Sequence, residues 1–275
     1  MYDTTENILN ILKQYNDQDK CDFQYHYDTI KSYVKERKTI PAIIPAFPGK
    51  AINPNLCPSN IPDGAEEYAI NSLKKITTDI QKIYKPGIHI KIFHDGYYFI
   101  PLGMDYDYYH MQEYVDIIRK MCKNHQISSI DMKDTTEGST FEARLNYWQF
   151  YNTPTDDEVQ DFMREHEDVY VGLLAFFFNN YSSYLYPLES RNFRKKISEF
   201  IAHKYIGINL GVQKYIADNF PNYLRLSVKR QNNSSSHKLY IDLLKGIKNE
   251  GLPWMNTLVK DDGELVIQKF RKDAA

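Results

Sequence analysis

Apolar positions recur at helical spacing in several stretches of the chain. Ile8, Ile11, Leu12 and Tyr15 follow Asp3 in this way, and Glu6 lies three positions after Asp3 as a capping partner, which predicts a short amphipathic helix over 4–15. Asp63 and Glu66 have the same relation before an apolar stripe formed by Ala65, Ala69, Ile70, Leu73, Ile76, Ile80 and Ile83. Helices are also predicted over 111–122, from Thr155 to about Asn180, and over 193–219, the last as one helix or a broken pair.

Other stretches alternate with a period of two. Ile88, Ile90 and Ile92 alternate with His89 and Lys91, which predicts a strand, and Asp95-Gly96 before the aromatic residues 97–99 predicts a tight turn and a second strand. Short strands are also expected over 127–132, 223–229 and 238–244, and on both sides of Asp262-Gly263 as a hairpin. The sequence therefore predicts an α/β fold, a mixed sheet flanked by helices, with a strand-rich C-terminal quarter.

The segment 39–62 fits neither period. It is largely apolar and contains six prolines, at positions 41, 45, 48, 54, 58 and 62. Proline lacks the backbone donor that a helix needs, so a regular helix is excluded. We expect an irregular loop that forms part of a site.

Length and composition favour one globular unit. The 275 residues have no internal repeat and no linker-like tract, so we expect a single domain, 1–275, in which 1–38 is an N-terminal helical appendage. The net charge of −2 provides no field that would attract nucleic acid. No signal peptide is recognisable, and the longest apolar run, 171–178, is too short to span a membrane. The three cysteines, at 21, 57 and 122, lack CxxC spacing, which favours a reducing compartment, with the cytosol as the default.

The common cofactor motifs are absent. No G-x-G-x-x-G occurs, and Pro48-Gly49-Lys50 lacks the upstream glycine and following Ser or Thr of a P-loop. The eight histidines form no HExxH pair, and no GxSxG is present. We therefore expect neither a nucleotide nor a metal, and a pocket for an anion is the remaining possibility.

Three sites could provide such a pocket, and each has a simpler alternative. Lys50 could project a cation from the proline-rich loop, or it could be an ordinary surface lysine. His94-Asp95 lies at a strand end, where α/β sheets bind ligands, but a plain turn explains it as well.

Arg225 shares a strand face with Tyr223, Ser227 and Lys229, while Leu224, Leu226 and Val228 point to the core. That polar face could hold an anion or face solvent. The apolar run that starts at 171 is more typical of helix core than of an aromatic cage.

Taken together, five segments resemble the pyoverdine/dityrosine biosynthesis family, the isonitrile synthases. They are PAFPGKAINPN at 45–55, IPDGAEEYAI at 61–70, IYKPGIHIKIFHDGYYF at 83–99, LRLSVK at 224–229 and GLPW at 251–254. The resemblance implies a Rossmann-like fold and an enzyme that converts the amino group of Tyr or Trp to an isonitrile, with ribulose 5-phosphate as carbon donor and no metal or nucleotide cofactor. It also implies that the product passes to a 2-oxoglutarate-dependent iron oxygenase. Fungal relatives form an N-formyl tyrosine instead.

The resemblance also suggests functional residues. Lys50, Asp95, Glu66 and His94 are the expected catalytic residues, although Glu66 has the alternative role of a helix cap. The expected substrate-binding residues are Asn53, Arg144, Arg225, Lys229 and Lys238, of which Arg225 would hold a phosphate or carboxylate.

Three positions depart from the family pattern. Lys229-Arg230 stands where relatives usually have His-Pro, Met255 where they have His, and Tyr97 where they have Arg. His94 or His237 could then act as the base, the substrate preference could differ, or activity could be lost. A non-catalytic binding protein and another transferase or lyase acting on a sugar phosphate are the alternative functions.

Overall fold

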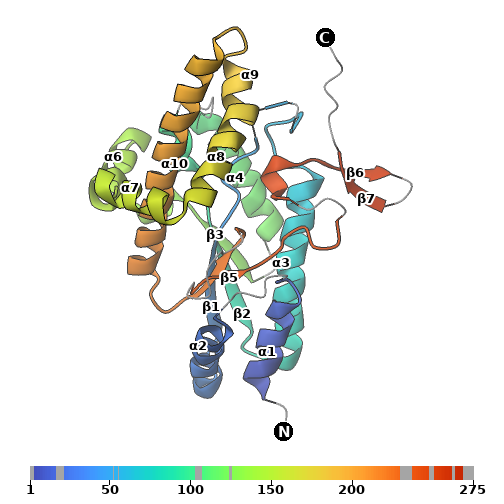
Figure 1. The fold of residues 1–275 in the computed structure, drawn as a ribbon. Helices are drawn as coiled ribbons and strands as arrows, with labels where there is room; N and C mark the ends of the chain where they lie inside the picture. Colours follow the sequence, from blue (N-terminus) through green and yellow to red (C-terminus); the bar gives the residue numbers. More distant parts are fainter. Residues whose placement is uncertain are drawn as a thin grey trace. The chain divides into compact units, whose positions relative to one another are not determined.

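The computed structural model describes residues 3–16, 22–51, 53–54, 56–102, 107–123, 126–229, 237–247, 251–261 and 264–268. The chain forms two compact units (Figure 1). Unit 1 comprises 1–95, 109–131 and 222–275, and unit 2 comprises 96–108 and 132–221. Arg230, the polar segment 231–236 and the turn at Asp262-Gly263 lie outside the described residues.

Unit 1 is built on a five-stranded sheet in the order β3-β2-β1-β4-β5, with every neighbouring pair parallel. Its strands are β1 (Ile40–Pro45), β2 (Ile88–Phe93), β3 (Ile127–Ile130), β4 (Leu224–Ser227) and β5 (Leu239–Tyr240). This is the Rossmann strand order, so the predicted α/β, Rossmann-like fold is confirmed. The expected hairpin is also present as a separate antiparallel pair, β6 (Leu258–Asp261) and β7 (Glu264–Ile267), which completes the strand-rich C-terminal quarter.

The central strand β1 lies inside the proline-rich segment, so the prediction that this segment is irregular was wrong for 40–45. Toward β2, Ile40 N donates to Gly87 O and Ala46 N donates to Phe93 O. In a strand with two neighbours, the backbone groups of successive residues point to opposite neighbouring strands. The even-numbered residues 40 and 46 bond toward β2, so the odd-numbered Pro41 and Pro45 point toward β4. There β1 pairs only through residues 42 and 43, and the prolines therefore interrupt no bond of that short pairing.

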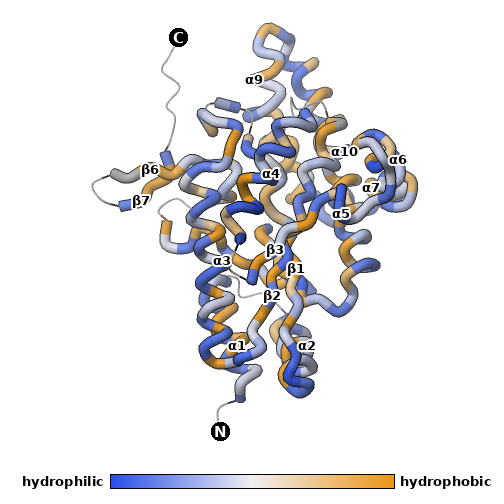
Figure 2. Tube along the Cα trace, turned by 180° about the vertical axis from the view of Figure 1, so that it is seen from behind, coloured by the Kyte–Doolittle hydropathy of each residue, from blue (hydrophilic) through white to orange (hydrophobic). Residues whose placement is uncertain are grey.

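Four helices accompany the sheet: α1 (Thr4–Lys13), α2 (Phe23–Glu36), α3 (Gly64–Ile83) and α4 (Tyr108–Cys122), of which residues from 109 onward belong to unit 1. The helices α1, α3 and α4 confirm predictions, and α2 lies in the segment 1–38 that was expected to be helical, although no bounds were predicted for it. Residues along the strands are predominantly hydrophobic in Figure 2. They share one core with residues of all four helices, among them Ile8, Ile30, Ile76 and Ile118.

Unit 2 is helical within the described residues. It contains η1 (Gly96–Leu102), α5 (Met132–Thr135), α6 (Phe141–Asn152), α7 (Asp156–Glu165), α8 (Glu167–Phe177), the π-helical turn η2 (Phe178–Ser182), α9 (Ser183–Leu185) and α10 (Arg191–Asn219). The predicted strand at 97–99 was wrong, because these residues form the 3-10 helix η1 with buried aromatic rings.

The Thr155–Glu158 capping box is confirmed, but the predicted long helix after it is broken at His166 into α7 and α8. The stretch 193–219 lies in one unbroken helix, α10.

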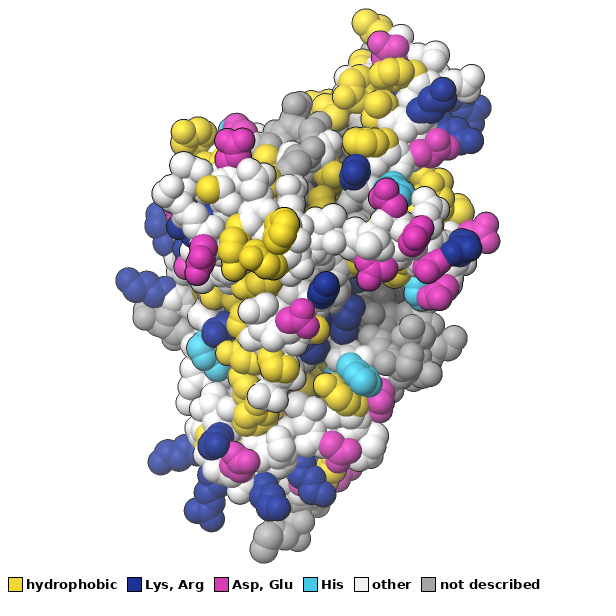
Figure 3. Space-filling model, turned by 90° about the vertical axis from the view of Figure 1, so that its left-hand side faces the viewer, with side chains coloured by type: hydrophobic (Ala, Val, Ile, Leu, Met, Phe, Trp, Pro, Cys, Tyr) yellow, Lys and Arg dark blue, Asp and Glu magenta, His cyan; other side chains and the backbone are white. Residues whose placement is uncertain are grey.

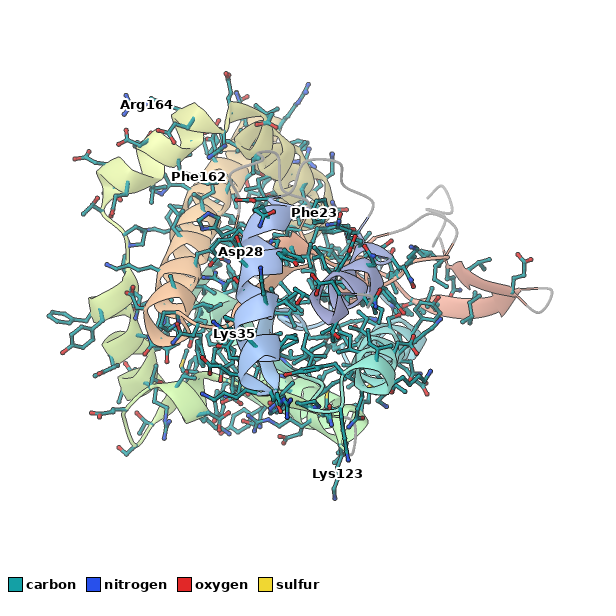
Figure 4. All side chains as sticks on the ribbon, turned by 90° about the horizontal axis from the view of Figure 1, so that it is seen from below. Phe23, Asp28, Lys35, Lys123, Phe162 and Arg164 are labelled. Atoms are coloured by element: carbon teal, nitrogen blue, oxygen red, sulfur yellow. The ribbon has the colours of Figure 1, made fainter. Side chains whose placement is uncertain are left out.

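The N-terminal helices are integral to the core of unit 1. α2 packs against β1 and β4, and α1 packs against α2 and α3. Figure 4 shows α2 from below, with Phe23, Asp28 and Lys35 spaced along it. The single-domain description of 1–275, with 1–38 as an appendage, stays a prediction. Among the described helices, none has the length and apolar character required to cross a membrane.

Candidate functional site

The carboxyl ends of the five parallel strands meet at one edge of the sheet, which is where α/β folds place ligands. The segments that follow the strands carry most of the residues that the sequence singled out. Lys50 follows β1, His94 and Asp95 follow β2, and Lys229 follows β4. The candidate site therefore lies at this edge.

The loop after β1 turns sharply. Phe47 has a φ of 57° and Gly49 a φ of 117°, both in the region that favours glycine. A bulky residue with positive φ is uncommon and often accompanies a functional constraint. The carbonyl of Phe47 lies 3.2 Å from Nδ1 of the buried His94, so this loop is tied to the end of β2.

Lys50 is carried by this turn into a buried cluster of carboxylates and carbonyls. Its Nζ lies 2.7 Å from Glu66 Oε2 and 3.0 Å from Asp63 Oδ1. It also donates to the carbonyls of Asn256 and Pro253, at 2.7 and 3.3 Å. We call this group the Lys50 cluster. The side chain of Lys50 is fully buried, so a simple surface lysine is excluded.

Glu66 is held by donors on both oxygens. Oε2 accepts from Lys50 and from the backbone N of Asp63, and Oε1 accepts from the hydroxyl of Tyr114 at 3.1 Å. Burial raises the pKa of Glu66 to about 7, and the nearby Lys50 ammonium opposes that rise. Glu66 is thus a capping residue of α3 and an ion-pair partner at once.

Trp254, from the C-terminal segment 251–256, borders the Lys50 cluster. Its carbonyl accepts from Ala51 N at 2.8 Å, and its ring lies 5.7 Å from that of Phe47. Cys57 Sγ also lies 3.7 Å from this carbonyl, and burial raises the pKa of Cys57 to about 11, which makes it a poor nucleophile. The segments PAFPGK, IPDGAEEY and GLPW, far apart in sequence, therefore meet here.

A second group, the cation cluster, consists of Arg225, Lys229 and Lys238. Leu226 pairs with Leu239, so Lys238 lies beside Arg225 across the β4–β5 pair. The prediction that residues 224, 226 and 228 point to the core is confirmed, because all three are buried there. Arg225 and Lys229 alternate with these residues and therefore lie on the other face of the strand.

Burial perturbs Arg225 and Lys238, and repulsion by neighbouring cations adds to the effect at Lys238. Burial lowers the pKa of Lys238 to about 8, and Arg225 and Lys229 lower it further by their positive charge. Burial also lowers the pKa of Arg225, against an opposing influence of Tyr25. An anion bound here would relieve the repulsion.

Asp95 provides a buried carboxyl group near the cation cluster. Burial raises its pKa to about 6, and the charge of Lys229 opposes this rise. Its Oδ1 has no hydrogen-bond partner among the described residues, although the side chain is more than nine-tenths buried. A buried oxygen without a partner is costly and marks a position suited to a ligand donor.

Sequence reasoning missed the aromatic residues of α2 that border the cation cluster. Tyr25 stacks on His237, with ring centroids 4.0 Å apart, and the buried His26 lies against Tyr25. Burial lowers the pKa of His26 to about 4, so it is neutral near pH 7. Residues 1–38 were expected to be helical, but the mixed aromatic and polar pattern of 23–36 gave no clear face, so the position of these side chains could not be predicted.

The remaining expected residues have other surroundings. Asn53 is buried in the loop after Lys50. Arg144 lies in unit 2, where it donates to the carbonyls of Lys133 and Thr136 at 2.6 and 2.9 Å. Met255 packs against the core of unit 1, and Tyr97 lies in η1 near the rings of Tyr108 and Phe141. The substrate-binding and catalytic roles expected for all these side chains stay predictions.

Metal ligands do not gather in the part of the chain that the structure describes: no group of three His, Cys, Asp or Glu residues is placed to hold an ion there.

Comparison with known proteins gives a consistent result. Residues 30–275 match the family described as pyoverdine/dityrosine biosynthesis protein. The chain is similar to the L-tryptophan isonitrile synthase AmbI1 of Fischerella ambigua, with 26% identity over 89% of this chain and 77% of the relative. It is also similar to an L-tyrosine isonitrile synthase of Pseudomonas aeruginosa, with 25% identity over 90% and 77%. The crystal structure of the PvcA protein from Pseudomonas aeruginosa shares the fold, with a TM-score of 0.88, 21% identity and coverage of 98% of this chain and 92% of that chain.

Proposed function

Because the chain belongs to the pyoverdine/dityrosine biosynthesis protein family, we propose that it converts the α-amino group of an aromatic L-amino acid, Tyr or Trp, to an isonitrile with ribulose 5-phosphate as carbon donor. The chain is an enzyme of the isonitrile-synthase type, and the choice of amino acid and donor is the proposal. The observation that carries it is the cation cluster beside the buried Asp95.

The charges of the cation cluster match those of the two substrates. A sugar phosphate carries about −1.5 to −2 near pH 7, as other phosphate monoesters do, and an amino acid adds one carboxylate. Arg225, Lys229 and Lys238 together supply three positive charges: Arg225 within β4, Lys229 after its carboxyl end, and Lys238 beside Arg225 just before β5. The planar guanidinium of Arg225 suits two parallel bonds to phosphate or carboxylate oxygens.

The proposed reaction also needs a group that accepts and returns protons. The amino nitrogen attacks the C2 ketone of the sugar phosphate, water leaves to give an imine, protons are moved, and the remaining sugar carbons are lost. Asp95, with a pKa of about 6, is ionised in most molecules at pH 7 and still gives back a proton readily. Asp95 is therefore our first choice for the acid–base residue.

The Lys50 cluster serves the proposed site in a different way. All contacts of Lys50 described above are with carboxylates and carbonyls that hold segments 46–51 and 251–256 together. We propose that Lys50 and Glu66 fix the loop after β1, which carries Asn53 and contacts His94 through the carbonyl of Phe47. A direct catalytic role for either stays a prediction.

Two further parts of the proposal concern the cell. The family resemblance suggests that the product passes to a 2-oxoglutarate-dependent iron oxygenase. The three isolated cysteines favour the cytosol as the compartment in which the chain works.

Mass spectrometry of the purified chain with Tyr or Trp and carbon-labelled ribulose 5-phosphate tests the proposal. We expect a product that has gained one labelled carbon and lost two hydrogens. A product with the mass of an N-formyl amino acid would assign the dityrosine-type reaction instead, and substrate binding without any product would assign a non-catalytic relative.

Two variants make this test specific. Asp95→Asn should bind both substrates and form no product, because the amide cannot exchange the proton. Lys82→Met, which removes an exposed lysine at the end of α3, is the matched control and should keep full turnover. Full turnover by Asp95→Asn would contradict the proposed acid–base role.

A further inference from the structure

The helix α8 is apolar on all sides and yet largely uncovered. After Glu167 and Asp168 it reads VYVGLLAFF, and Phe177 is its one buried residue among those described. Val171 is 54% exposed. A helix without a polar face is normally buried. Within unit 2, α8 packs against α7, α10 and η2, which leaves part of its surface open.

The neighbouring helices continue this apolar surface. Phe193 and Phe200, seven residues apart on one face of α10, are 40% and 55% exposed. Tyr184 on α9 is partly exposed, and Leu188 in the following turn is 99% exposed. We call Val171, Tyr184, Leu188, Phe193 and Phe200 the hairpin surface, since α8 to α10 form a helical hairpin. Exposed apolar patches on a protein surface mark interaction sites.

Opposite charges lie at the two ends of the hairpin. Residues 156–168, at the end where α8 begins, contain seven carboxylates and one arginine. Residues 191–196, at the other end where α10 begins, contain four cations and no carboxylate. Figure 3 shows a group of Lys and Arg side chains at the upper right, with single Asp or Glu side chains above and below it, and a larger group of Asp and Glu side chains further down on the right. Arg164 lies at the outer edge of α7 in Figure 4.

We propose that the hairpin surface binds a second copy of this chain in an antiparallel, two-fold arrangement. Such an arrangement places the acidic end of each hairpin against the basic end of the other, with the apolar residues of both between them. One patch that carries both charges and an apolar centre complements itself, as a two-fold interface requires. An anionic membrane would instead be repelled by the seven carboxylates at one end.

The apolar part of the proposal is tested by sedimentation equilibrium of the full chain. We expect the wild type to dimerise and Phe200→Asp to be a monomer with an unchanged circular dichroism spectrum. Phe150→Asp, at a position that is 82% exposed on α6 and outside the hairpin surface, is the matched control and should stay dimeric. A monomeric wild type, or a dimer that Phe200→Asp leaves intact, would overturn the proposal.

The charged part is tested by reversal. Arg191→Glu with Lys196→Glu should give monomers, and so should Glu165→Lys with Glu167→Lys, because like charges would then face each other. An equimolar mixture of the two double variants should form heterodimers, and a chain with all four changes should dimerise again. If the mixture stays monomeric while the wild type dimerises, the antiparallel arrangement is wrong.

Discussion

Two charged clusters of unit 1 contain lysine side chains, and they differ in the kinds of charged and polar groups that surround those lysines. In the Lys50 cluster, one ammonium is surrounded by two carboxylates and two carbonyls. In the cation cluster, the positive charges of Arg225 and Lys229 lower the pKa of Lys238, and the charge of Lys229 opposes the rise in the pKa of Asp95. The groups named in the first cluster are mainly acceptors, and those named in the second are mainly cations.

This difference separates a structural role from a binding role. A buried ion pair whose donors and acceptors are satisfied leaves nothing for a ligand to bind, and removal of one partner destabilises the fold because the other charge stays buried alone. A cluster of like charges destabilises the fold until an anion neutralises it. The two clusters should therefore respond in opposite ways when one charged group is removed.

The largest effect is expected for Lys50→Met. Removal of the ammonium leaves Glu66 buried beside Asp63, so the free energy of unfolding should fall by about 3–5 kcal/mol. Urea unfolding at pH 7 measures it, and Lys82→Met, at an exposed ion pair, should cause no measurable change. A fall below about 1 kcal/mol for Lys50→Met would show that the pair is not structural.

Asp95→Asn should stabilise the chain. The folded pKa of about 6 lies above the 3.8 of an ordinary aspartate, so between these pH values the folded state binds more protons than the unfolded state. The contribution of Asp95 to stability therefore falls as pH rises from about 4 to about 6. At pH 7 the variant should be more stable by up to about 3 kcal/mol, and at pH 4 it should equal the wild type.

Unfolding of both proteins between pH 4 and pH 7 measures this difference. Asp28→Asn, on the exposed side of α2, is the control and should show the pH dependence of the wild type. If Asp95→Asn is less stable than the wild type at pH 7, the ionised carboxylate of Asp95 stabilises the fold. The cation cluster would then have a structural role, contrary to the binding role assigned to it.

Arg225→Met should weaken ligand binding and leave the fold intact. A charge-assisted bond to phosphate contributes about 1.5–3 kcal/mol, so the Kd for ribulose 5-phosphate should rise by roughly 10- to 150-fold. Arg225→Lys should restore only part of it, because a point charge lacks the planar fork. Calorimetric titration measures both, and an unchanged Kd would place the phosphate elsewhere.

The smallest effect concerns Lys238. Its pKa of about 8 leaves many molecules neutral at pH 8, and a bound anion favours the charged form, so binding should take up a proton. Titration of inorganic phosphate in two buffers of different ionisation enthalpy measures the uptake. Arg225→Met should reduce it, since Arg225 is one cause of the low pKa; equal uptake in both proteins would contradict the coupling.

Local patterns predicted the elements that have a clear period. The helix stripe after Asp63 and the alternation of 88–92 were sufficient for α3 and β2. The strand β1 was missed because a fully buried parallel strand reads as a continuous apolar run, and its prolines concealed it further. Residues 97–99 were mistaken for a strand because aromatic residues that fill a core in a short 3-10 helix have the composition of a strand.

The candidate site was predictable only as separate pieces. Alternation alone placed Arg225 and Lys229 on one face of a strand. The position of Lys238 beside Arg225 depends on the register of β5, which pairs with β4 through two residues. The partners of Lys50 include carbonyls from residues 253 and 256, and no local pattern indicates contacts at that separation.

The strand order has a consequence for how the chain is made. On the ribosome β1 emerges early, but its neighbour β4 lies about 180 residues later, and the carbonyls that hold Lys50 come later still. At synthesis rates of about 5–20 residues per second, the central strand waits on the order of ten seconds or more for its second partner. During that interval the edge of β1 and the charge of Lys50 both lack their final partners, so this stage of synthesis is the one at which chaperones would have most to protect.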